Sequence, residues 1–252
     1  MHRQEKIGHP RLRRDIRLHS PPVLGTFITF EGIDGSGKST QLRLLAQYLR
    51  AQGCELLLSR EPGGTPVGLR LREALLDVRG EVDPLTELLV FAADRAQHVR
   101  KVIRPALEKG AVLISDRYAD ATRAYQGAGR GFSPELIAEI IELATGGLVP
   151  DLTVLFDVSI EESITRTTRR SAKNKRDRLD TEAADFHERV REEYMRIARA
   201  EPERVKVIDT TGTVDETQEK LRAIVVPFLQ HRDQLTTRLV DNEPYKLKRG
   251  HC

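Results

Sequence analysis

Short apolar runs alternate along this chain with longer segments whose apolar residues recur at helical spacing. The apolar runs cover residues 26–31, 54–59, 111–116, 152–158 and 205–210. Runs this short and this continuously apolar are typical of strands buried on both faces, as in a parallel sheet covered by helices. The pattern therefore predicts an α/β protein with a doubly wound, five-stranded parallel sheet and helices on both faces.

The segments between these runs carry helix signals. The predicted helices cover residues 38–52, 66–76, 83–108 and 133–144, with others between the last two strands and after them. Asp83 is a favourable N-cap, and Pro84 suits the first helical turn because its missing N–H has no partner there. One domain over residues 23–230 accounts for this pattern.

The two ends of the chain fall outside it. Residues 1–22 hold six basic and two acidic residues, whereas the whole chain of 252 residues has a net charge of only +3. We expect a disordered basic leader here, with an organelle presequence as the alternative. Residues 231–252 lose the helical pattern, and we expect a poorly ordered tail. The near-neutral remainder does not indicate a nucleic-acid-binding face.

Cysteine usage and hydropathy suggest the compartment. Cys54 and Cys252 are the only cysteines and cannot form a disulfide framework, which suits a reducing interior. The leader lacks the apolar stretch of a signal peptide, and no run approaches membrane-spanning length. We expect a cytoplasmic protein that binds neither membrane nor nucleic acid.

A phosphate-binding loop directly follows the first strand. Residues 32–39 read GIDGSGKS and fit G-x-x-x-x-G-K-[ST], in which glycines let successive N–H groups converge on phosphate oxygens. The helix N-terminus adds favourable dipole charge, Lys38 is expected to reach the β- and γ-phosphates, and Ser39 to ligate Mg²⁺. The predicted ATP-phosphate site comprises Gly32, Ile33, Asp34, Gly35, Ser36, Gly37, Lys38, Ser39 and Thr40.

Two strings mimic GTPase motifs. Residues 209–212 fit D-x-x-G and residues 174–177 fit N-K-x-D, but their order is reversed. Residue 174 also follows a charged helical stretch, whereas a guanine-reading loop should follow an apolar strand. We therefore do not interpret the chain as a GTPase.

Candidate acceptor residues follow the third strand and lie on the long helix. Asp116 and Arg117 end a parallel strand and are expected to face the ligand crevice, where Asp116 could hold Mg²⁺ through water and Arg117 could clamp a phosphate. Phe91 and Arg95 share one helix face, so a ring and a guanidinium could bind a base. A core phenylalanine and a solvated arginine would show the same spacing.

Five segments, in order, resemble thymidylate (dTMP) kinase of the bacterial kind. They read FEGIDGSGKSTQ (30–41), SREPGGT (59–65), LLVFAADRAQH (88–98), DRYADATRAYQGAGRG (116–131) and PDLTVLFDV (150–158). The resemblance runs from about Gly25 to Leu229. It implies a P-loop nucleoside monophosphate kinase fold, a homodimer, and phosphorylation of dTMP to dTDP with ATP and Mg²⁺.

The resemblance also implies roles at the base. Phe91 would stack on thymine, Arg95 would donate to its O4, and Thr122 would offer a hydroxyl to the base edge. Tyr125 would close the space beneath the deoxyribose and reject a 2′-hydroxyl. Gln126 would sit near the base or sugar.

Other implied roles concern the phosphates. Arg60 and Arg117 would grip the dTMP phosphate, and Asp34 would contact the 3′-hydroxyl and help to order Mg²⁺. Asp94 would orient Arg95. The acceptor oxygen is already anionic, so catalysis needs no general base and rests on positioning and charge neutralisation by Mg²⁺, Lys38 and arginines.

A basic segment at about 166–180 matches the lid of nucleoside monophosphate kinases, although such a run is also typical of a solvated face. The phosphate loop contains no arginine, so the resemblance places the catalytic arginine in the lid. Arg178 fits best, and Arg170 and Arg176 remain candidates. The adenine site is expected near Arg166 and the loop after residue 210.

Two alternatives stay open. A deoxynucleoside kinase, or another nucleoside monophosphate kinase, could share the scaffold. A deoxynucleoside kinase would need a carboxylate base after the second strand, where Glu61 stands. A regulatory P-loop ATPase would instead use the basic leader and lid as contacts.

Overall fold

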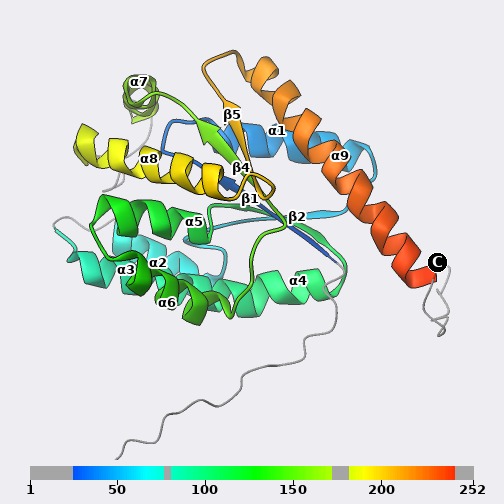
Figure 1. Cartoon of the computed structure of the whole chain (residues 1–252), viewed down its shortest axis with the longest axis horizontal. Helices are drawn as coiled ribbons and strands as arrows, with labels where there is room; N and C mark the ends of the chain where they lie inside the picture. Colours follow the sequence, from blue (N-terminus) through cyan, green and yellow to red (C-terminus); the bar gives the residue numbers. More distant parts are fainter. Residues whose placement is uncertain (1–24, 77–80, 172–181, 242–252) are drawn as a thin grey trace, which may run out of the picture.

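The computed structural model describes residues 25–76, 81–171 and 182–241 (Figure 1). The expected leader, the string at 174–177, and Arg176, Arg178 and Cys252 lie outside these residues. The helix α9 continues to residue 241, past the end at 230 that the sequence pattern predicts for the domain.

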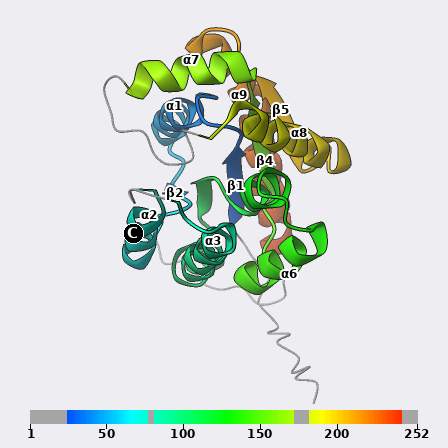
Figure 2. The ribbon, with the colours of Figure 1, turned by 90° about the vertical axis from the view of Figure 1, so that its left-hand side faces the viewer.

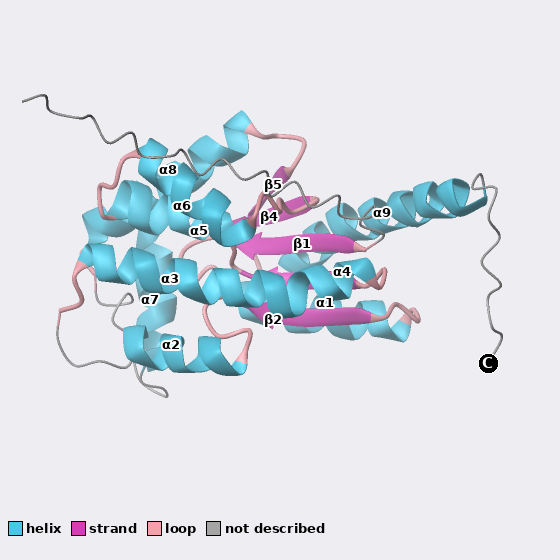
Figure 3. Ribbon diagram, turned by 90° about the horizontal axis from the view of Figure 1, so that it is seen from below, coloured by secondary structure: helices cyan, strands magenta, loops and turns pink. Residues whose placement is uncertain are grey.

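Five strands form one all-parallel sheet, which confirms the predicted fold class. They are β1 (Thr26–Glu31), β2 (Leu56–Arg60), β3 (Val112–Asp116), β4 (Leu152–Asp157) and β5 (Val205–Asp209), in the order β2-β3-β1-β4-β5. In β1 every residue is buried, because this strand is central and Ile28 pairs with Ile114 on one side and Leu152 on the other. Figure 3 shows β1 and β2 pointing in the same direction.

Helices cover both faces of the sheet (Figures 1 and 2). One face carries α1 (Lys38–Ala51) and α9 (Val214–Asp241), whose apolar residues pack on Ile28, Phe30 and Val154. The other face carries α2 (Pro66–Leu76), α3 (Pro84–His98), α5 (Ala119–Thr122), α6 (Pro134–Thr145) and α8 (Ala184–Ala200). Helix α7 (Ile160–Ser171) follows β4 at the carboxyl end of the sheet. Among the described residues, no helix combines the length and apolar character needed to cross a membrane.

The long helix predicted over 83–108 has three parts. Asp83 caps α3 as predicted, accepting bonds from the N–H groups of Leu85 and Thr86. A π-helical segment, η1 (Val99–Ile103), then leads into α4 (Arg104–Glu108). Pro105 explains the change, because proline has no N–H to donate and its ring crowds the preceding turn. A second π-helical segment, η2 (Arg123–Gly129), follows α5.

Candidate active site

The phosphate loop lies between β1 and α1, at the carboxyl end of the sheet. Gly35 has a φ of +75°, and a Cβ there would lie 2.7 Å from the carbonyl oxygen of Ser163. A side chain at this position would be strained and crowded. Ser163 also donates its hydroxyl to the carbonyl oxygen of Asp34 at 2.6 Å, so α7 is held against the loop.

Lys38 is buried at the start of α1. Its ammonium donates to the carbonyl oxygens of Gly32 and Ile33, both at 2.8 Å, and to the Ser36 hydroxyl at 3.2 Å. Burial and the neighbouring Arg117 lower the pKa of Lys38 to about 8. A bound phosphate would offer the ammonium anionic oxygens in exchange for these carbonyl oxygens.

The two residues predicted to bind Mg²⁺ lie together. The Ser39 hydroxyl donates to the Asp116 carboxylate at 3.0 Å. Mg²⁺ prefers oxygen ligands and is often held by one or two carboxylates together with phosphates and water, so this pair fits the ion. Within the described ranges, no group of three or more His, Cys, Asp or Glu side chains could hold a metal.

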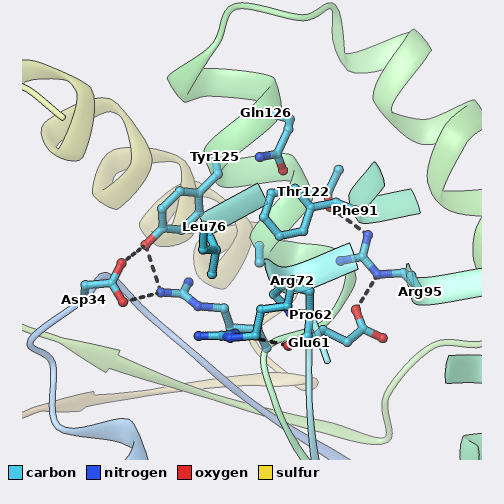
Figure 4. A pocket seen from close by; sticks show the side chains of 12 residues that line it. Asp34, Glu61, Pro62, Arg72, Leu76, Phe91, Arg95, Thr122, Tyr125 and Gln126 are labelled. Atoms are coloured by element: carbon cyan, nitrogen blue, oxygen red, sulfur yellow. Dashed lines mark hydrogen bonds and ion pairs between the residues drawn. The ribbon is translucent and has the colours of Figure 1, made fainter. Parts of the chain in front are cut away.

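Asp34, Arg117 and Tyr125 form a hydrogen-bonded triangle beside the phosphate loop (Figure 4, where Asp34 and Tyr125 are labelled). Arg117 Nη2 donates to Asp34 Oδ1 at 2.9 Å and to the Tyr125 hydroxyl at 3.0 Å, and that hydroxyl donates to Asp34 Oδ2 at 3.2 Å. Arg117 has a φ of +73°, a conformation that costs a non-glycine residue about 1–3 kcal/mol. Its N–H bonds to the Phe30 carbonyl at 2.9 Å, which helps to hold the strained backbone.

Glu31 lies fully buried beneath this triangle, and the motif analysis missed it. It accepts bonds from the Tyr118 N–H at 2.7 Å and the Tyr194 hydroxyl at 2.8 Å. Burial, and then the nearby Asp120, raise the pKa of Glu31 to about 8. The sequence did contain a signal for Glu31, because it is the one carboxylate in the otherwise uncharged strand β1 and stands directly before the phosphate loop.

Arg95 lies on α3 and is fully buried. Its Nε donates to Glu61 Oε2 at 2.8 Å, Nη1 to the Thr122 hydroxyl at 2.7 Å, and Nη2 to the Tyr118 carbonyl at 2.8 Å. These contacts use three of the five N–H groups of a guanidinium. The Thr122 oxygen accepts from Arg95, so its own hydrogen can be donated to a ligand.

A buried network fixes Glu61, which in turn fixes Arg95. His98 Nδ1 lies 2.8 Å from Glu61 Oε1, and His98 Nε2 lies 2.6 Å from the Ser59 hydroxyl. Asp94, which the resemblance assigned to orienting Arg95, instead accepts a hydrogen bond from the Gly63 N–H at 3.1 Å. Burial raises the pKa of Asp94 to about 6, with a contribution from the Glu61 charge.

The Asp34–Arg117–Tyr125 triangle and Arg95 lie at opposite ends of one pocket (Figure 4). It is lined by Asp34, Glu61, Pro62, Arg72, Leu76, Phe91, Arg95, Arg117, Ala121, Thr122, Tyr125 and Gln126. Arg60 lies at the exposed end of β2 and is not among these lining residues, whereas Arg72, which the sequence analysis did not single out, is. Arg72 Nη1 donates to the Pro62 carbonyl at 3.1 Å. The described structure thus brings together all the predicted dTMP-binding residues except Arg60.

The basic segment is described only in part. Arg166 Nη2 donates to the Thr210 carbonyl at 2.9 Å, so the two regions expected near adenine lie in contact. The backbone of Arg170 belongs to α7, but its side chain is not described. Arg176 and Arg178 lie outside the described residues, and the choice of catalytic arginine stays a prediction.

Comparison with known proteins identifies relatives along most of the chain. A family model described as thymidylate kinase matches residues 30–221. The thymidylate kinase of Symbiobacterium thermophilum is 45% identical over 210 residues, which span 83% of this chain and 96% of that protein. The thymidylate kinase of Deinococcus radiodurans is 48% identical over 201 residues, 80% of this chain and 96% of that protein.

A solved structure agrees. The crystal structure of thymidylate kinase from Ehrlichia chaffeensis is similar with a TM-score of 0.65 and 33% sequence identity. The match covers 80% of this chain and 98% of that one.

Proposed function

We propose which part of dTMP binds at each end of the pocket, given that this chain belongs to the thymidylate kinase family and phosphorylates dTMP with ATP as the phosphate donor. The thymine ring binds at Arg95, and the dTMP phosphate binds at Arg117, beside the phosphate loop. The single observation that carries this proposal is the pocket itself, which is lined by the Arg117 guanidinium at one end and the Arg95 guanidinium at the other.

At the phosphate end, chemistry proceeds by positioning and charge neutralisation. A phosphate oxygen of dTMP attacks the γ-phosphorus of ATP in line, and the bond from that phosphorus to the bridging oxygen breaks, so that ADP leaves as dTDP forms. Because the attacking oxygen is already anionic, no proton has to be removed. Arg117 holds the acceptor phosphate, which it can do by exchanging its bond to Asp34 for phosphate oxygens. Asp34 is then available to a sugar hydroxyl.

The donor side uses the phosphate loop. Lys38 and the loop N–H groups bind the β- and γ-phosphates, and Ser39 and Asp116 hold Mg²⁺. The ion, when bound, neutralises charge on the phosphate oxygens. We also propose that an arginine of the lid, Arg178 or else Arg170 or Arg176, stabilises the transferring group, since the loop itself contains none.

At the base end, fixed groups recognise thymine. Arg95 donates to O4 through its remaining N–H groups, Thr122 donates its hydroxyl hydrogen to the same edge, and Phe91 stacks on the ring. Tyr125 lies under the sugar, between the two ends. Arg60, at the edge of the crevice, is a weaker candidate for the dTMP phosphate because it does not line the pocket.

The position of Glu61 argues against a deoxynucleoside kinase. Such an enzyme needs a carboxylate base beside the hydroxyl that attacks. Glu61 instead has one oxygen on Arg95 and the other on His98, each at 2.8 Å, at the base end of the pocket. A homodimer and a cytoplasmic location complete the proposal.

The test is an ADP-release assay with ATP and Mg²⁺ that offers dTMP, dUMP, thymidine, AMP or no acceptor in parallel. We expect fast turnover with dTMP, weaker turnover with dUMP, and little with the others. Turnover with thymidine but not dTMP would overturn the acceptor assignment. Turnover that is equal without any acceptor would indicate an ATPase, and omission of Mg²⁺ should abolish the reaction.

A further inference from the structure

Glu87 lies behind the wall of the pocket, on the first turns of α3, and is fully buried. Its Oε1 accepts a hydrogen bond from Gln126 Nε2 at 2.8 Å. Arg130 contacts both carboxylate oxygens, with Nε at 3.2 Å from Oε1 and Nη2 at 2.9 Å from Oε2. The Glu87 carboxylate is therefore neutralised and held in one orientation.

This contact determines which way the Gln126 amide faces. A carboxylate can only accept hydrogen bonds, so Gln126 must turn its NH₂ group toward Glu87 and its carbonyl oxygen away. Gln126 is only 2% exposed and lines the pocket. Figure 4 shows its side-chain oxygen directed toward Phe91, into the pocket.

We propose that Glu87 is a positioning residue that fixes Gln126 as a hydrogen-bond acceptor for the base. The inference rests on the proposed function and adds to it a determinant of base selectivity. Thymine and uracil carry an N–H at ring position 3, which can donate to the Gln126 oxygen. Cytosine has a lone pair at that position, and two acceptors would face each other.

The arrangement of α3 supports this assignment. Glu87, Phe91 and Arg95 follow one another at intervals of four residues and so lie along one face of the helix. This face supplies a stacking ring, a donor for O4, and the carboxylate that orients an acceptor for N3–H. The two polar groups are thus placed to match the donor and acceptor pattern of thymine.

The π-helical segment η2 completes the arrangement. In a π-helix each backbone N–H bonds to the carbonyl five residues earlier, instead of four as in an α-helix. The bond from Arg130 N–H to the Tyr125 carbonyl at 3.0 Å is an example. Successive side chains in such a wide turn diverge less in direction. Tyr125 and Gln126, which are adjacent in sequence, are accordingly both buried and both line the pocket.

The central test is the variant Glu87→Gln, measured with dTMP, dUMP and dCMP as acceptors. A glutamine at 87 can donate to the Gln126 oxygen, so the Gln126 amide is free to turn over and present NH₂ to the base. The ratio of kcat/KM for dTMP over dCMP should fall about tenfold. The ratio for dTMP over dUMP should stay constant, because thymine and uracil present the same hydrogen-bonding edge.

Glu182→Gln is the matched control. Glu182 is the second carboxylate group bound to Arg130, with its Oε1 at 2.6 Å, so this variant also removes one negative charge beside that guanidinium. It should leave both acceptor ratios as in the wild type. In a Gln126→Leu background, Glu87→Gln should produce no further change in the dTMP over dCMP ratio, because the amide that it releases is gone.

The outcomes separate the two proposals. A wild-type protein that does not phosphorylate dTMP overturns the proposed function. A wild-type protein that does so, with a Glu87→Gln variant that keeps its dTMP over dCMP ratio or shifts both ratios equally, overturns the role of Glu87. If Glu87→Gln does not fold, the double variant Glu87→Gln/Arg130→Met also removes the guanidinium that has lost one of its two carboxylate partners. The same two acceptor ratios, measured on this double variant, then test the role of Glu87.

Discussion

The two ends of the pocket are built in different ways. At the phosphate end, the phosphate loop directly follows β1 and Arg117 directly follows β3. These strands are neighbours in a parallel sheet, so chain order alone places the residues together. At the base end, Arg95 is held by Glu61, 34 residues away, and by Thr122, 27 residues away. The base end therefore forms only when α3 packs against the segments that carry Glu61 and Thr122.

The ion pairs at the two ends also differ in their exposure to solvent. Asp34 and Arg117 are partly exposed, with side chains 22% and 17% accessible, and a bound phosphate can rearrange them. Arg95 and Glu61 are each 2% accessible and satisfy each other before any ligand arrives. Changes at the phosphate end should therefore reduce turnover, whereas changes at the base end should reduce stability and dTMP affinity.

The largest expected effect follows from Arg117→Ala. The variant removes the guanidinium that neutralises the acceptor phosphate, so kcat/KM for dTMP should fall about 10²–10³-fold, or ~3–4 kcal/mol of transition-state stabilisation. Steady-state kinetics with dTMP, alongside thermal unfolding, would measure this. Arg123→Ala is the control, because Arg123 pairs with Glu201 outside the pocket. Near-normal turnover of Arg117→Ala would remove this residue from the site.

The second effect tests the base end through Glu61→Gln. Removing one partner of a buried ion pair leaves Arg95 without its counter-charge and should lower the free energy of unfolding by about 3 kcal/mol. KM for dTMP should rise about tenfold, while kcat at saturating dTMP changes little. Denaturant unfolding and dTMP titrations provide the two readouts.

A partly exposed carboxylate provides the comparison for Glu61. Glu73→Gln weakens a pair with Arg70 in which both side chains are more than half accessible, and it should cost about 1 kcal/mol or less. If Glu61→Gln instead abolished kcat and left KM unchanged, Glu61 would be acting as a base, and the two ends would not divide binding from chemistry.

The same contrast explains what could be predicted from the sequence. The five strands and the phosphate loop are encoded locally, by apolar runs and by glycine spacing, and their prediction is confirmed for the fold. The partner of Arg95 is not encoded locally. Asp94 is adjacent to Arg95 in the chain but accepts a hydrogen bond from Gly63. The actual partner of Arg95 is Glu61, which lies in the loop after β2.

The π-helical segments were missed for a similar reason. Apolar periodicity extends across residues 83–108, and only the backbone constraint at Pro105 separates η1 from the flanking α-helices. The ion pair of Glu87 with Arg130, 43 residues away, likewise has no signal in spacing. Buried polar pairs between distant segments depend on tertiary packing, which a local pattern does not contain.

A smaller effect concerns Glu31, beneath the phosphate end. Its pKa is raised from 4.5 to about 8 in the folded protein, so folding retains a proton that the unfolded chain releases between these pH values. This contribution to stability is complete below pH 4.5 and is lost as the pH rises through 8. Relative to the wild type, Glu31→Gln should be more stable at pH 6.5 than at pH 5, by about 2 kcal/mol.

Unfolding of the ligand-free proteins at several pH values would measure this difference. All other titrating groups are shared by the two proteins, so the difference isolates residue 31. Parallel pH profiles for wild type and Glu31→Gln would show that Glu31 is ionised in the folded state, and the phosphate end would then carry one more negative charge than we infer.

The smallest effect lies between the two ends, at Tyr125. Its hydroxyl joins Arg117 to Asp34, while its ring lies under the Arg117 guanidinium, 4.8 Å from it. Tyr125→Phe keeps the ring and removes one hydrogen bond, so kcat/KM should fall about fivefold, or ~1 kcal/mol. Tyr118→Phe removes a hydroxyl that bonds to the Leu148 carbonyl at 3.1 Å, and it should cost similar stability with less loss of activity. If both variants reduced kcat/KM equally, the Tyr125 hydroxyl would serve the fold rather than the alignment of Arg117, and the triangle would not belong to the catalytic apparatus.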